Sequence, residues 1–284
     1  MEVPHVFGDF NHLMGVVNKP DSTKSNVGVI LLTAGMLHHV GPFRLYVNLA
    51  RRLEQLGIPS LRFDLSGIGE SLPVASGGTS LQRAANETRQ AMDFLQENYG
   101  VERFVLFGLC SGADDGFHTA IDEDRIDGLV LLDGCGYPTA EFNKRRVFAH
   151  YLPRVKSLTW WKRKVSRSGN DAPSSLPIGN DIREFPSRDV AAKQLQGLVD
   201  RGTKLHFIYS GGVSEYYNHE SQFDEMFHDV DFRGQVTSRF LPEMDHVAIL
   251  CEDRAELVTE ISDWVSRSFT PASADADQDE LVAV

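Results

Sequence analysis

Short apolar runs alternate with longer helical patterns along most of the chain. The first run, over 27–33, is continuously apolar, which is typical of a parallel strand buried on both faces. The first helical pattern ends before Gly57, a residue that favours a helix C-terminus. The alternation predicts an α/β fold with a doubly wound, mostly parallel sheet. The expected strands are 27–33, 60–63, 104–106, 128–132, 205–209 and 236–240, and the expected helices are 43–56, 81–99, 113–121 and 255–268.

One stretch, from 134 to 188, breaks this alternation. It has no strand-like run, and it holds basic clusters before and after Trp160 and Trp161, followed by a loop rich in glycine, serine and proline. Because ligands bind at the carboxyl edge of open α/β sheets, we interpret 134–188 as a cap inserted over that edge. The core then consists of 1–133 and 189–269. The remaining residues, 270–284, are rich in alanine, serine and aspartate, which predicts a disordered acidic tail.

The run Gly108-Leu109-Cys110-Ser111-Gly112 follows an expected strand and precedes an expected helix. A strand, a sharp Gly-x-nucleophile-x-Gly turn and a helix form the nucleophile elbow of α/β-hydrolases. Side chains at the two glycine positions would collide with the tight turn around the strained nucleophile. The central residue is a cysteine where serine is usual. A thiolate is a strong nucleophile when a base and a helix N-terminus are close, so Cys110 is the predicted nucleophile.

Four motifs, taken in order, resemble the α/β-hydrolase superfamily over nearly the whole chain. They are Leu32 to Met36, where the superfamily usually has His-Gly-x, Asp64 to Ser71, which is similar to D-x-R-G-x-G-x-S, the elbow at Cys110, and Asp245-His246. This resemblance implies an α/β-hydrolase fold with an inserted helical cap.

A narrower resemblance is to hydrolases that accompany exosortase gene clusters. It rests on Gly108-Leu109-Cys110, on Arg62-Phe63-Asp64 with Gly67-Ile68-Gly69-Glu70-Ser71, and on Tyr209-Ser210-Gly211. The basic and aromatic cap is similar to theirs as well.

The superfamily resemblance implies His246 as the base, because it stands after the last expected strand and before the last expected helix. A carboxylate should hold its imidazole in the tautomer that accepts the thiol proton. The superfamily's acid usually follows the strand that corresponds to 205–209, which makes Glu215 the first candidate. Asp133, at the end of the strand 128–132, is the alternative, because some members place the acid there. A Cys-His dyad without an acid is a further alternative.

The oxyanion hole should use the backbone N–H groups of Met36 and Ser111, since backbone donors of this kind stabilise the charge of a tetrahedral intermediate. His38 and His39 follow the same turn. They are candidate substrate-binding residues, although a polar loop explains them equally simply.

Three further residues are candidates for substrate binding. Asp115, early in the elbow helix, could bind a substrate amine or simply favour the helix dipole. Trp160 and Trp161 either pack a cap helix on the core or form a docking face for an acidic carrier protein or its phosphopantetheine arm. No set of residues has a recognisable metal-ligand spacing, so we expect neither a metal nor a cofactor.

Charge and cysteine content narrow the class of protein. The 284 residues carry 28 basic and 40 acidic side chains, a net charge of −12, which argues against nonspecific nucleic-acid binding. No run approaches the roughly 20 apolar residues of a membrane span, and no signal peptide is visible. The three cysteines, Cys110, Cys135 and Cys251, form no CxxC pair or disulfide framework, which predicts a reducing, cytoplasmic setting.

The leading hypothesis is a hydrolase of acyl esters or acyl thioesters that works through a covalent S-acyl intermediate on Cys110. Its substrate would be a small acyl compound, free or bound to coenzyme A or a carrier protein, and a homodimer is compatible with the sequence. Because an S-acyl cysteine reacts comparatively slowly with water and fast with amines and thiols, an acyltransferase is the alternative. The second alternative is a noncatalytic binding protein of the same fold.

Overall fold

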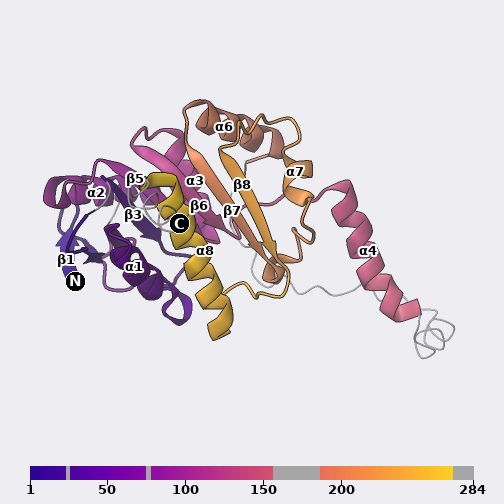
Figure 1. Cartoon of the computed structure of the whole chain (residues 1–284), viewed down its shortest axis with the longest axis horizontal. Helices are drawn as coiled ribbons and strands as arrows, with labels where there is room; N and C mark the ends of the chain where they lie inside the picture. Colours follow the sequence, from indigo (N-terminus) through magenta and orange to yellow (C-terminus); the bar gives the residue numbers. More distant parts are fainter. Residues whose placement is uncertain (24–25, 75–77, 156–185, 271–284) are drawn as a thin grey trace, which may run out of the picture.

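The core of the molecule is an eight-stranded sheet (Figure 1). The computed structural model describes residues 1–23, 26–74, 78–155 and 186–270. The strands are β1 Glu2–Phe7, β2 Leu13–Asn18, β3 Val27–Leu32, β4 Ser60–Phe63, β5 Arg103–Leu109, β6 Ile126–Leu132, β7 Lys204–Ser210 and β8 Val236–Leu241. Their order is β1-β2-β4-β3-β5-β6-β7-β8. β2 runs opposite to the other seven strands and pairs antiparallel with β1 and β4, whereas all other pairs are parallel, so the predicted mostly parallel sheet is confirmed.

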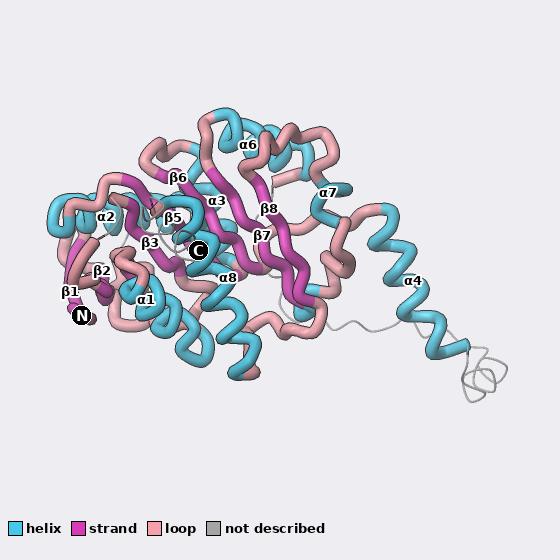
Figure 2. Tube along the Cα trace, viewed as in Figure 1, coloured by secondary structure: helices cyan, strands magenta, loops and turns pink. Residues whose placement is uncertain are grey.

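Helices cover both faces of this sheet (Figure 2). They are α1 Leu45–Gln55, α2 Ser80–Tyr99, α3 Ser111–Ile121, α4 Ala140–Val155, α6 Arg188–Asp200, α7 Gln222–Met226 and α8 Cys251–Phe269, with 3₁₀ turns η1 Pro42–Arg44 and η2 Gly211–Val213. The apolar faces of α2, α3 and α6 belong to one buried cluster. Those of α1 and α8 belong to a second cluster on the opposite face. The fold is therefore doubly wound.

Local sequence determines where the helix α2 begins and ends. Thr79 Oγ1 accepts a hydrogen bond from the Gln82 N–H at 3.3 Å, and Gln82 Oε1 accepts one from the Thr79 N–H at 3.0 Å. This capping box satisfies two backbone donors that a helix start leaves open. The helix stops at Gly100, whose φ of +69° is left-handed, a conformation that glycine adopts without strain.

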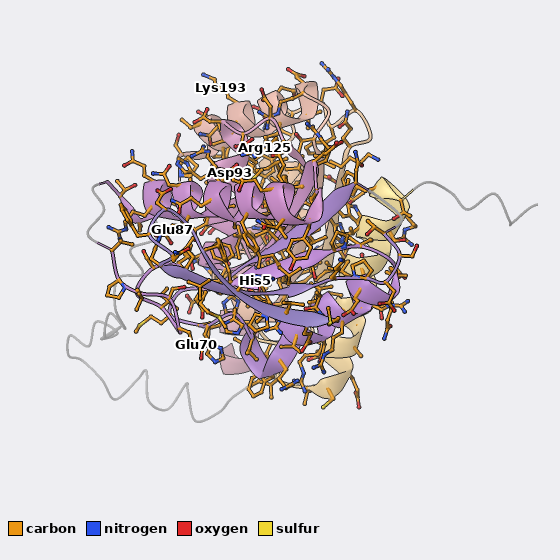
Figure 3. All side chains as sticks on the ribbon, turned by 90° about the vertical axis from the view of Figure 1, so that its left-hand side faces the viewer. His5, Glu70, Glu87, Asp93, Arg125 and Lys193 are labelled. Atoms are coloured by element: carbon orange, nitrogen blue, oxygen red, sulfur yellow. The ribbon has the colours of Figure 1, made fainter. Side chains whose placement is uncertain are left out.

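Polar side chains then tie α2 to the rest of the core, on the side that Figure 3 shows. Glu87 of α2 is buried, and its carboxylate accepts hydrogen bonds from the Ser66 N–H at 2.8 Å and from Ser66 Oγ at 2.5 Å. Arg125, just before β6, donates to Asp93 of α2 at 2.7 Å. Through Ser66, α2 holds the turn that follows β4, at the carboxyl edge of the sheet.

All ten elements expected from the sequence are present, with ends shifted by at most four residues. The hairpin of β1 and β2 and the helix α6 were not among them. β1 is an edge strand that contains Pro4, and proline lacks the N–H that a strand interior needs. Its polar residues also give it no apolar run.

Parts of the predicted cap and tail lie outside the described residues. The beginning of the cap forms α4, which extends away from the sheet (Figure 1). Trp160, Trp161 and the basic residues after them fall within 156–185, and 271–284 of the tail is likewise not described. Over the ranges that the structure does describe, no helix has both the length and the apolar character to cross a membrane.

Candidate active site

Cys110 stands at a sharp turn between β5 and α3. Its φ of 56° and ψ of −123° are rare for a residue with a side chain. A Cβ on Gly108 would overlap the Gly112 carbonyl, and a Cβ on Gly112 would lie 2.6 Å from the Leu32 oxygen. Both elbow glycines are therefore required by the turn. Because α3 begins at Ser111, Cys110 lies at the positive end of a helix.

His246 lies in the loop between β8 and α8 and joins Cys110 to Asp133. Its Nδ1–H donates to Asp133 Oδ2 at 2.8 Å, and a second side-chain hydrogen bond links the ring to Cys110. The bonds to the Asp133 carboxylate and to the Cys110 sulfur, in that order, raise the pKa of His246 to about 10, against the opposing effect of burial. The ring is therefore an imidazolium at neutral pH, which is the form that pairs with a thiolate.

Asp133 follows β6, and its side chain is fully buried. Oδ1 accepts a hydrogen bond from the Ser210 N–H at 2.7 Å. Oδ2 accepts from Ser210 Oγ at 2.6 Å as well as from His246. A buried carboxylate is costly unless donors compensate for its lost hydration, and these three donors do so. Sequence reasoning did not assign Ser210 a role at the site, although it directly follows the predicted strand 205–209, which pairs with β6.

The structure places the two acid candidates in different surroundings. Glu215 is exposed in the turn after η2, whereas Asp133 contacts His246. The chain leaves β7 through Gly211 and Gly212, and a Cβ on Gly212 would overlap the backbone of His246. Backbone rather than a carboxylate therefore occupies the space next to His246 where β7 ends. This geometry favours Asp133 over Glu215 as the acid that orients His246.

The two predicted oxyanion donors lie on neighbouring strands at the carboxyl edge. Met36 follows β3 and Ser111 follows the end of β5, which pairs with β3. Ser111 Oγ accepts a hydrogen bond from the Gly35 N–H at 2.7 Å, which ties the turn after β3 to the elbow. Within the described ranges, neither the Met36 nor the Ser111 N–H donates an intramolecular hydrogen bond. Both groups therefore remain candidate donors of the oxyanion hole.

His38 and His39 differ in their surroundings. His38 is exposed, whereas His39 is buried with Nδ1 2.8 Å from Asp64 Oδ2. Burial raises the pKa of Asp64, but the hydrogen bonds from His39 and from the Glu70 N–H outweigh it and keep that pKa below its usual value. His39 therefore joins the turn after β3 to the turn after β4, which gives it a structural role.

The remaining predicted binding residues are Asp115, Trp160 and Trp161. Asp115 is half-buried on α3, and its carbonyl accepts a hydrogen bond from Thr119 Oγ1 at 2.7 Å. Trp160 and Trp161 lie outside the described residues. Among the residues that the structure describes, no group of three or more His, Cys, Asp or Glu side chains could hold a metal ion.

Comparison with known proteins identifies solved structures that share the fold of this chain. No protein-family model and no curated protein sequence matches the chain. Among solved structures, a proline iminopeptidase of Mycobacterium smegmatis is 15% identical with a TM-score of 0.55, over 94% of this chain and 98% of that one. An esterase of Pyrococcus furiosus is 15% identical with a TM-score of 0.57, over 94% and 90%. A serine α/β-hydrolase without a lid from Xanthomonas campestris is 13% identical with a TM-score of 0.57, over 96% of each chain.

Proposed function

Because the chain has the α/β-hydrolase fold, we propose that it is an enzyme that cleaves acyl esters or acyl thioesters through an S-acyl intermediate on Cys110. The proposal rests on one observation: at the carboxyl edge of the sheet, His246 interacts with both Cys110 and Asp133. These three residues supply a nucleophile, a proton carrier and an acid from the ends of β5, β8 and β6. These are the roles that acyl transfer requires.

Acylation begins from the thiolate–imidazolium pair. The Cys110 sulfur attacks the acyl carbon and forms the C–S bond, and the carbonyl oxygen becomes an oxyanion. The N–H groups of Met36 and Ser111 would stabilise that charge, and one such donor is worth about 3 kcal/mol in related sites. As the tetrahedral intermediate collapses, the bond to the leaving alcohol or thiol breaks. The leaving group takes the proton from His246, which becomes neutral.

Deacylation reverses these proton movements. Neutral His246 accepts a proton from water, whose oxygen attacks the S-acyl carbon. The C–S bond then breaks, the carboxylic acid leaves, and the thiolate–imidazolium pair is restored. Throughout, Asp133 holds Nδ1–H, so that the other ring nitrogen faces the thiol or water.

The most direct test is the intact mass of the protein after incubation with a panel of acyl thioesters and activated esters. We expect a mass increase of one acyl group, located on Cys110 by peptide mapping, followed by its loss as the acid appears. An acyl group that stays on Cys110 until an amine is added would favour the acyltransferase alternative. If no donor in the panel acylates Cys110, the noncatalytic alternative is preferred.

Replacing His246 with alanine should change how the reactivity of Cys110 depends on pH. In the wild type, the protonated His246 ring lies beside the thiol and favours its ionised form, so alkylation by iodoacetamide should depend less steeply on pH than in the variant. In His246→Ala the thiol must ionise unaided, as free cysteine does near pH 8.5. We expect slower alkylation at pH 7 and a steep rise with pH.

His228→Ala is the matched control, because His228 is a histidine outside the group of Cys110, His246 and Asp133. It should keep the wild-type profile. Superimposable profiles for His246→Ala and the wild type would show that His246 does not act on the thiol.

A further inference from the structure

A cavity of about 280 Å³ lies against α3, the helix that begins after Cys110. Its walls come from the start of α2, from one side of α3, from α6 and from the segment after β6. The apolar part of the lining consists of Leu81, Phe117, Ile121 and Pro186. The volume is slightly below the usual range for ligand pockets, about 300–1,000 Å³, so the cavity suits a small or slender group.

The wall formed by α3 extends along the helix, away from the proposed nucleophile Cys110. It consists of Asp114, Phe117, His118 and Ile121, which are spaced i, i+3, i+4 and i+7 and so form one stripe on the helix. At a rise of about 1.5 Å per residue, the stripe starts about 6 Å beyond Cys110 and continues for about 10 Å. With C–C bonds of about 1.5 Å, an extended chain of about eight carbons has that length.

The segment after β6 forms a second wall of the cavity and is close along the chain to the proposed acid. Cys135 lines the same cavity and stands two residues after Asp133, at the carboxyl edge of β6. Two of the segments that line this cavity therefore begin, along the chain, next to the proposed nucleophile and the proposed acid. We propose that the cavity holds the apolar end of the acyl chain that is transferred to Cys110. Because this chain must first cross the roughly 6 Å between Cys110 and the start of the stripe, a chain of about ten to fourteen carbons would fill the cavity. This inference rests on the proposed function for the identity of the ligand.

The cavity contains its own reporter, the thiol of Cys135, and the exposed Cys251 serves as an internal reference. In Cys110→Ala, which has no nucleophile at the elbow, iodoacetamide alkylation of both thiols is followed by mass spectrometry. Octanamide, an unreactive amide analogue, should slow alkylation of Cys135 several-fold and leave Cys251 unchanged, whereas acetamide should protect neither. Equal effects of the two amides on Cys135, or none, would overturn the proposal.

A variant tests the same cavity in the protein with Cys110 intact. Ile121→Trp should lower the rate of dodecanoyl transfer to Cys110 relative to acetyl transfer by at least about tenfold, because a few methylenes in an apolar pocket have effects of this size. Val190→Trp, at an exposed position of α6, should leave the ratio unchanged. An unchanged ratio in Ile121→Trp contradicts the proposal. If no thioester acylates Cys110, the proposed function fails. The protection of Cys135 from alkylation then tests independently whether the cavity binds an alkyl chain.

The network around Asp133 supports a second, independent inference. Ser210 Oγ accepts a hydrogen bond from the Gly212 N–H at 3.2 Å, so its own proton is directed to Asp133 Oδ2 at 2.6 Å. The same Oδ2 accepts from His246, and both Ser210 and Asp133 are buried. We infer that Ser210 is a positioning residue, which fixes the carboxylate against the imidazole.

Its test compares Ser210→Ala with the hydroxyl-retaining Ser210→Thr. Loss of one hydrogen bond to a charged group corresponds to a decrease in kcat of about ten- to a hundredfold in Ser210→Ala, with KM unchanged. The Nδ1–H proton resonance of His246 should broaden in the same variant, while Ser210→Thr restores both properties. A sharp, unshifted resonance with wild-type kcat in Ser210→Ala would overturn the inference, as would a Thr variant that folds but behaves like Ala.

Discussion

Cys110→Ala should remove both the S-acyl intermediate and turnover, with a loss of about 10⁶-fold in kcat, the size found when the nucleophile of a comparable triad is deleted. The fold should persist, because alanine keeps the Cβ that the strained backbone at φ 56° already accommodates. Intact mass reports the missing acyl group, and steady-state release of the acid or thiol reports the rate. Cys110→Ser should also be much slower, since a hydroxyl is far less acidic than a thiol.

Two other cysteines provide the controls for this result. Cys251 is exposed at the start of α8, and its sulfur accepts a hydrogen bond from Arg254 at 3.0 Å. Cys135 lines the cavity beside α3. Cys251→Ala should keep full activity, and Cys135→Ala should still form the S-acyl intermediate on Cys110. Wild-type turnover in Cys110→Ala would refute the proposed mechanism, whatever the behaviour of the other two variants.

The elbow could be predicted from the sequence because its signals are local. The glycines at positions 108 and 112 are required by contacts within the turn itself, and the strand before it and the helix after it have their own apolar patterns. The helical pattern of α2 was equally clear in the sequence, and the structure adds the capping box at Thr79 and the helix end at Gly100. The edge strand β1 lacked such signals because Glu2, Pro4 and His5 interrupt its apolar residues. Proline is tolerated there because one side of an edge strand is unpaired.

The acid could not be chosen from the sequence because the choice depends on how distant segments meet. Glu215 and Asp133 each follow a central strand, and a linear pattern does not show which one faces the loop after β8. The features that favour Asp133 are the close approach of Gly212 to His246 and the bonds from Ser210 to Asp133. His39 was ambiguous for the same reason, since its partner Asp64 is 25 residues further along the chain.

The charge state of His246 gives the second large effect. Asp133→Asn removes the main cause of its raised pKa, so that pKa should fall from about 10 towards the ordinary 6.5, as measured by NMR titration of the ring. Because the pKa of His246 is higher in the folded than in the unfolded state, its protonation contributes to the free energy of unfolding. This contribution is fully present below pH 6.5 and is lost as the pH rises towards 10. The stability advantage of the wild type over Asp133→Asn in urea unfolding should therefore shrink across that range.

The same substitution should lower kcat by up to about 10⁴-fold, the loss seen when a triad acid becomes an amide and its histidine takes the wrong tautomer. Asparagine preserves the shape of the side chain, so the buried site should remain packed. Glu215→Gln is the matched control: its side chain is exposed in the turn after η2, and it should change neither kcat nor the titration of His246. If Glu215→Gln is the damaging substitution and Asp133→Asn is harmless, the acid is Glu215. If both are harmless, Cys110 and His246 act as a dyad, and the bond from His246 to Asp133 serves the fold alone.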